Sequence, residues 1–116
     1  MTRERPPASR RGKTHKIVLN GVTLYLTVNE VKGRPIEMFC KADEGWQGWV
    51  DTLCVTASLA LQCGVPIRDI IRHWSNQAFP PAAIGQGKSI PDAMARVLAQ
   101  DYPDPSESDQ GAGKGR

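Results

Sequence analysis

The chain has 116 residues, of which 40% are hydrophobic and 23% are charged, and its formal net charge at pH 7 is +3. This length predicts one domain and leaves no room for a large catalytic domain. No run is long and apolar enough to span a membrane, and the first residues lack the apolar segment of a signal peptide, so we expect a cytoplasmic location.

The two ends of the chain differ in composition from its middle. Residues 1–13 are rich in arginine and proline, and residues 101–116 contain mainly Pro, Ser, Asp and Gly. Neither stretch offers enough apolar surface to offset the entropy lost on ordering. We therefore predict a disordered basic arm over 1–13, a folded domain over 14–100 and a disordered tail over 101–116. The arm has the charge to contact a polyanion, although a solubilising role is the simpler interpretation.

Three strands are predicted in the first part of the domain. Apolar and polar residues alternate over 22–29 and again over 36–40, which is the period of a strand with one buried face. Asn20–Gly21 predicts a hairpin turn after a first strand over 16–20, and Lys32–Gly33 predicts a second turn. Consecutive strands joined by short turns form an antiparallel meander.

Helices are predicted in the second part. Apolar residues recur at three- and four-residue spacing over 50–61, 67–74 and 90–98, and each set forms one face of a helix. Gly64 is suited to end the first helix, and Pro66 is suited to begin the second. Strands followed by helices predict an α+β fold of two layers, with a three-stranded antiparallel meander covered on one face by two to three helices.

The other face of this sheet is predicted to be only partly polar, and the edges of the sheet would be unpaired in a monomer. A homodimer or a higher homo-oligomer is therefore expected. The predicted residues of that face are Tyr25, Thr27, Asn29, Glu37 and Phe39.

Four segments, in their order and spacing, resemble the TSCPD domain. They are residues 24–29 (LYLTVN), 33–39 (GRPIEMF), 59–66 (LALQCGVP) and 85–95 (GQGKSIPDAMA). Such domains lie towards the C-terminus of adenosylcobalamin-dependent ribonucleotide reductases and also occur as small separate proteins, some from phages. The resemblance covers about residues 14–100 and implies this fold and a role in nucleotide metabolism.

The chain departs from the family at the motif that gives the domain its name. Thr-Ser-Cys-Pro-Asp reads here as Lys88-Ser89-Ile90-Pro91-Asp92, so the resemblance implies no thiol chemistry at Ile90. The catalytic barrel, with its radical cysteine and its adenosylcobalamin site, is absent. We therefore expect a module that is not an enzyme and that holds no cofactor of its own, because fold alone does not transfer activity.

The best candidate site precedes the last predicted helix. Gly85 and Gly87 permit close backbone approach, Lys88 adds positive charge, and the start of the helix offers unpaired N–H groups. Ser89 and Asp92, at that start, complete the predicted ligand-binding residues of this segment. Together these features favour a phosphate or a carboxylate ligand. In the alternative interpretation, Ser89 and Asp92 only cap the helix, as an N-cap and a shortened capping box.

Two further residues are candidate contacts. Trp46 lies near glycines and is placed to stack on a nucleobase, which is worth roughly 1–3 kcal/mol, or else to pack at an interface. Arg72 shares a helix face with Arg68, so it is predicted either to contact an anion or to belong to a solvated surface. No metal is expected, since the cysteines lack CxxC spacing and are interpreted as reduced core residues.

These features predict a non-catalytic nucleotide- or anion-binding module with a phosphorylated nucleotide or a ribonucleotide reductase large subunit as its partner. Two alternatives remain open. One is a phage protein that sequesters a cyclic nucleotide defence signal, and the other is a protein-interaction module with no small ligand.

Overall fold

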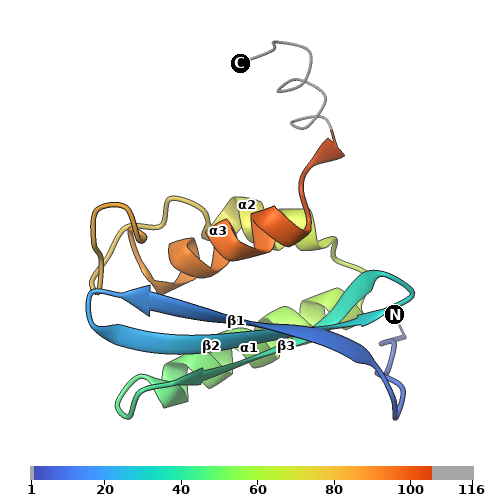
Figure 1. Ribbon diagram of the computed structural model, residues 1–116. Coiled ribbons are helices and arrows are strands. Elements are labelled where there is room, and N and C mark those ends of the chain that lie inside the picture. Colours follow the sequence, from blue (N-terminus) through green and yellow to red (C-terminus); the bar gives the residue numbers. More distant parts are fainter. Residues whose placement is uncertain (1, 106–116) are drawn as a thin grey trace.

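The computed structural model describes residues 2–105, and strands precede helices in the chain as predicted. The three strands are β1 (Arg11–Leu19), β2 (Val22–Val31) and β3 (Arg34–Ala42), and the three helices are α1 (Gln47–Gln62), α2 (Ile67–Trp74) and α3 (Ile90–Asp101). The strands follow one another in the sheet as antiparallel neighbours. The predicted α+β meander is confirmed (Figure 1).

Two tight turns set the register of the sheet. Asn20 and Gly21 have φ angles of 47° and 82°, and Lys32 and Gly33 have φ angles of 53° and 79°. Positive φ at both central residues is typical of the hairpin turn whose twist matches that of the flanking strands. Both turns are where the sequence predicts them, because this turn chemistry is local.

The helices cover one face of the sheet, which we call the covered face. In Figure 1, α1 runs along β3, whereas α3 lies over β1 with α2 packed beside it. Alternate residues of the strands are buried there in one cluster with residues of all three helices. The largest fully buried side chains are Leu19, Leu24, Leu26, Ile36, Met38, Val50, Ile90, Met94 and Leu98. The opposite, free face carries Thr14, Lys16, Val18, Thr23, Tyr25, Thr27, Phe39 and Lys41.

The outer edge of β3 is covered by α1. The side-chain amide of Gln47 donates to the carbonyl of Cys40 and accepts from the N–H of Ala42, both at 2.7 Å. The hydroxyl of Ser58 accepts from the N–H of Met38 at 2.9 Å and donates to the carbonyl of Met38 at 3.1 Å. The prediction that both edges of the sheet are unpaired is therefore wrong for β3, because side chains of α1 take the place of a neighbouring strand.

The first strand begins at Arg11, three residues before the predicted start of the domain at 14. Its first residues pair with Glu30 and Asn29 of β2, and a backbone ladder of this kind needs no apolar side chains. Just before it, Arg10 forms an ion pair with Glu37. At the other end, α3 extends to Asp101, and most of the predicted tail, 106–116, lies outside the described residues.

None of the helices within residues 2–105 is long and apolar enough to cross a membrane.

Candidate functional site

The glycine loop, residues 83–88, folds back on itself before α3. The N–H of Ala83 donates to the carbonyl of Gly87 at 2.9 Å, and the N–H of Gly87 donates back at 3.1 Å. Gly85, at the tip, has a φ of 82°, which favours glycine. A Cβ on Gly87 would lie 2.9 Å from the Cβ of Ala93, so the loop packs on the first turn of α3 only because residue 87 has no side chain.

An open groove with a volume of about 580 Å³ lies beside the glycine loop. It brings together three of the predicted site residues, Gly85, Gly87 and Lys88, with Phe79 and with Arg96 of α3. Arg96 is not predicted from the sequence, although it follows Asp92 by four residues on α3, a spacing that brings two helical side chains together. The full lining consists of Ala78, Phe79, Pro80, Ala82, Ala83, Ile84, Gly85, Gly87, Lys88 and Arg96.

Ser89 and Asp92 are buried and are used within the fold. Ser89 is the N-cap of α3, as predicted, and its hydroxyl accepts from the N–H of Asp92 at 3.1 Å. The Asp92 carboxylate does not close a capping box onto Ser89. It accepts instead from the N–H of Asn76 at 2.7 Å and from the N–H of Lys88 at 2.8 Å, and it pairs with Arg96 at 3.1 Å.

These contacts hold Asp92 ionised. Burial acts to raise its pKa, but the two backbone N–H groups and the Arg96 guanidinium outweigh burial and bring the pKa below its ordinary value. The start of α3 therefore already has a carboxylate within its first turn, where the helix dipole favours negative charge. Only the rim of the groove, at Lys88 and Arg96, presents positive charge to a ligand.

Two other predicted site residues lie outside the groove lining. Trp46 packs edge-on against Trp49 with ring centroids 6.4 Å apart, and Trp49 lies 6.4 Å from Phe79. These two ring contacts lead from Trp46 to Phe79 of the groove lining. Arg72 is on α2 and pairs with Asp69 at 2.8 Å.

The cysteines form a small buried group and a separate half-buried thiol. Burial is the main cause that raises the pKa of Cys40 to about 11 and that of Cys54 to about 12. Cys63 is half-buried, and all three are free thiols. Across residues 2–105, no three His, Cys, Asp or Glu side chains are grouped so as to hold a metal ion.

Comparison with known proteins identifies a family and several similar proteins. The TSCPD domain family model matches residues 1–102. The chain is 37% identical to a vitamin B12-dependent ribonucleotide reductase of Rhodopirellula baltica, over 97% of this chain and 12% of the relative. It is 33% identical to that of Bradyrhizobium diazoefficiens, over 97% of this chain and 11% of the relative. No solved structure matches the chain significantly.

Proposed function

Because this chain belongs to the TSCPD domain family, we propose that it is a non-catalytic binding module that serves nucleotide metabolism. The family match over residues 1–102 supports this proposal. The chain spans about an eighth of the length of the curated reductases it matches, 12% in the Rhodopirellula baltica relative. We therefore propose a binding role for this chain and do not propose the reductase reaction of those longer proteins for it.

The proposed ligand is a phosphorylated nucleotide, held in the groove beside the glycine loop. The observation that carries this proposal is the pairing of two cations, Lys88 and Arg96, with an apolar groove lined by Phe79. Lys88 and Arg96 suit phosphate oxygens. Phe79 is 42% exposed and offers a ring face to a nucleobase.

Asp92 limits the strength of this site. Its carboxylate pairs with Arg96, so the two cations face one fixed negative charge and the rim keeps a small positive excess. We therefore expect a nucleoside di- or triphosphate to bind more tightly than a monophosphate, since each added phosphate increases the attraction to Lys88 and Arg96.

The test is a thermal-shift titration of the full chain with nucleoside mono-, di- and triphosphates. A ligand at about a hundred times its Kd contributes about 2.7 kcal/mol to stability, which raises the melting temperature. The rise should disappear in Lys88→Ala and should remain in Arg72→Ala, which removes a cation outside the groove. The absence of a shift with every nucleotide would refute the ligand proposal.

Native mass spectrometry of the purified chain supplements this test. It reports a retained nucleotide and the predicted homo-oligomer in one measurement. The similarity to vitamin B12-dependent ribonucleotide reductases also motivates an accessory role beside a ribonucleotide reductase large subunit, which co-purification tests. If the large subunit is captured equally well with and without nucleotide, and no nucleotide is retained, the chain acts through protein contacts alone.

A further inference from the structure

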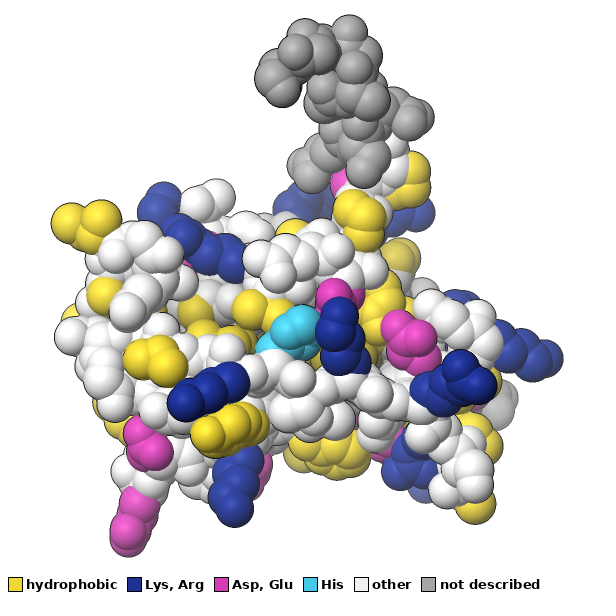
Figure 2. All heavy atoms as spheres, viewed as in Figure 1, with side chains coloured by type: hydrophobic (Ala, Val, Ile, Leu, Met, Phe, Trp, Pro, Cys, Tyr) yellow, Lys and Arg dark blue, Asp and Glu magenta, His cyan; other side chains and the backbone are white. Residues whose placement is uncertain are grey.

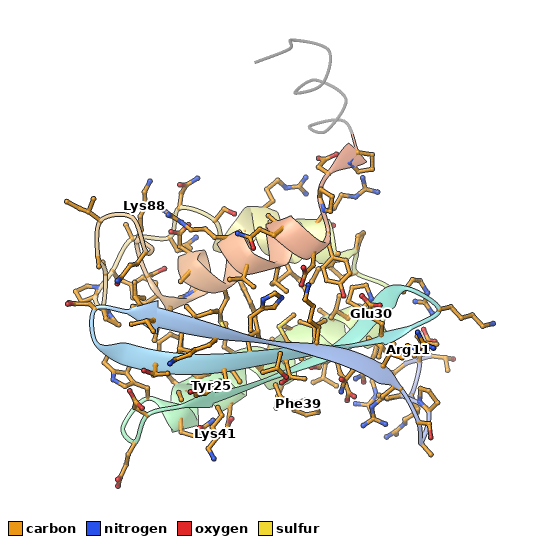
Figure 3. All side chains as sticks on the ribbon, in the orientation of Figure 1. Arg11, Tyr25, Glu30, Phe39, Lys41 and Lys88 are labelled. Carbon is orange, nitrogen blue, oxygen red and sulfur yellow. The ribbon has the colours of Figure 1, made fainter. Side chains whose placement is uncertain are left out.

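The free face of the sheet carries an aromatic and basic surface that the groove does not use. In one cross-strand row, Tyr25 of β2 lies between Lys16 of β1 and Lys41 of β3. In the next row, Thr27 lies between Thr14 and Phe39. Figure 3 shows Tyr25, Phe39 and Lys41 on the side of the sheet away from Lys88. We call these two rows the platform.

Both aromatic rings of the platform are accessible. Tyr25 is 43% exposed and Phe39 is 52% exposed, although aromatic side chains contribute a large apolar area when they are buried in a core. Tyr25 and Phe39 occupy diagonal positions on neighbouring strands, where residues are about 7–8 Å apart and their Cβ atoms are somewhat closer. Successive nucleotides of an extended single strand span such a separation, and each base presents a face that stacks on an aromatic ring.

The charge of the platform is positive. Lys16 and Lys41 are exposed on either side of Tyr25, and Figure 2 shows positive side chains alternating with a hydrophobic one along the lower part of the molecule. Glu37, in the row beyond Phe39, is 5% exposed, and its carboxylate is paired with Arg10. Glu37 therefore opposes a bound anion only weakly, and Arg10 brings the arginine-rich N-terminal segment to this end of the platform.

We propose that the platform binds single-stranded nucleic acid, with bases stacked on Tyr25 and Phe39 and phosphates near Lys16 and Lys41. A duplex fits poorly, because its bases are already stacked and its outer surface offers no ring to Tyr25 or Phe39. A second copy of the chain also fits poorly, since sheet-on-sheet packing would bring lysines of both copies together at the same face. This proposal is independent of the groove ligand.

The experiment is fluorescence anisotropy of the full chain with a labelled oligothymidine, an oligouridine and a duplex of the same length, at several salt concentrations. Both single strands should bind more tightly than the duplex, and comparison of the first two tells DNA from RNA. Tyr25→Ala and Phe39→Ala should each raise the Kd about fivefold or more, the lower limit for loss of one stacked base. Tyr25→Phe keeps the ring and should keep the affinity.

Two controls separate the platform from general surface effects. Val55→Ala changes an exposed hydrophobic residue of α1, 58% exposed, and should leave the Kd unchanged. Lys41→Gln should reduce the slope of log K against log salt by about 0.7, whereas Arg68→Gln, on α2, should not change it. The proposal is overturned if no single strand binds, or if the chain forms a dimer that Phe39→Glu dissociates, because a second copy then occupies this face.

Discussion

The carboxylate of Asp92 joins three parts of the chain at the residue scale. It accepts from the N–H groups of Asn76 and Lys88 and pairs with Arg96. Asp92→Ala leaves two partly buried N–H groups without their acceptor, and we expect it to lower the free energy of unfolding by about 2–3 kcal/mol. Urea denaturation of both proteins at neutral pH measures this difference. A loss below that of an ordinary surface substitution would contradict the assigned role.

The pH dependence of this effect has a definite sign. The pKa of Asp92 is lower in the folded chain than its ordinary value of 3.8. The ionised carboxylate therefore makes its full contribution to the free energy of unfolding above pH 3.8, and this contribution is lost as the pH falls through the lower pKa of the folded chain. The difference between wild type and Asp92→Ala should therefore narrow in strong acid. Asp69→Ala is the matched control, because Asp69 forms an exposed pair with Arg72 worth less than about 1 kcal/mol.

The thiols differ in reactivity for a physical reason. The thiolate is the reactive form, and burial raises the pKa of Cys40 and Cys54 to about 11 and about 12. At pH 8 we expect a disulfide-exchange reagent to modify Cys63 in the folded chain and the other two thiols only after denaturation. Mass spectrometry locates the modified residue, and Cys63→Ser should abolish the fast reaction. Rapid modification of three thiols in the folded chain would refute this prediction.

At the scale of elements, α1 acts as a cover for the edge of β3. Ser58 satisfies both backbone groups of Met38, and all of these groups are buried. Ser58→Ala should lower the free energy of unfolding by about 1–3 kcal/mol, since a buried N–H and a buried carbonyl lose a partner. Thr56→Ala, which removes an exposed hydroxyl bonded to Thr52 of the same helix, should change stability by less than about 0.5 kcal/mol. Chemical denaturation of the two variants compares them directly, and equal losses would count against the edge-cover role.

Two glycines near the ends of α1 should respond oppositely to alanine. Gly64 follows the helix and has a φ of 98°. The N–H of Val65 donates to the carbonyl of Ala60 at 2.9 Å, and these two features together form a Schellman motif. Gly64→Ala should cost about 1–2 kcal/mol through strain. Gly48 is helical with open space at its Cβ position, so Gly48→Ala should stabilise by up to about 1 kcal/mol. Thermal denaturation decides the signs, and a stabilising Gly64→Ala would be incompatible with this helix ending.

The elements were predictable because their determinants are local. The Asn20–Gly21 turn, the alternation over 22–29 and the Ser89 cap each depend on residues a few positions apart. The cover of β3 by α1 was not predictable, because Ser58 meets Met38 across 20 residues of sequence. Side-chain amides and hydroxyls carry no pattern in the sequence that distinguishes an edge contact from an exposed position.

At the scale of the whole molecule, the candidate site was predictable only in part, because some of its residues are far apart in the sequence. Gly85, Gly87 and Lys88 are close together in the sequence, so the sequence alone groups them. Phe79 and Arg96 join them in the groove only through the packing of the loop on α3. The sequence predicts Asp92 as a ligand or capping residue, but its carboxylate accepts from the N–H of Asn76, 16 residues away, and so holds two segments of the fold together.

One hydrophobic cluster connects every element of the described chain. The last helix is also joined to the first strand, since Asp101 contacts His15 at 2.6 Å and Lys13 at 3.1 Å. A chain with one shared core should unfold in a single cooperative transition. Urea titrations can be followed by tryptophan fluorescence, which reports α1, α2 and their contacts, and by far-ultraviolet circular dichroism, which includes the sheet. The two signals should therefore give the same midpoint. Separate midpoints would mean that the helices leave the sheet before it unfolds, and the groove beside α3 would then be lost while β1, β2 and β3 still paired.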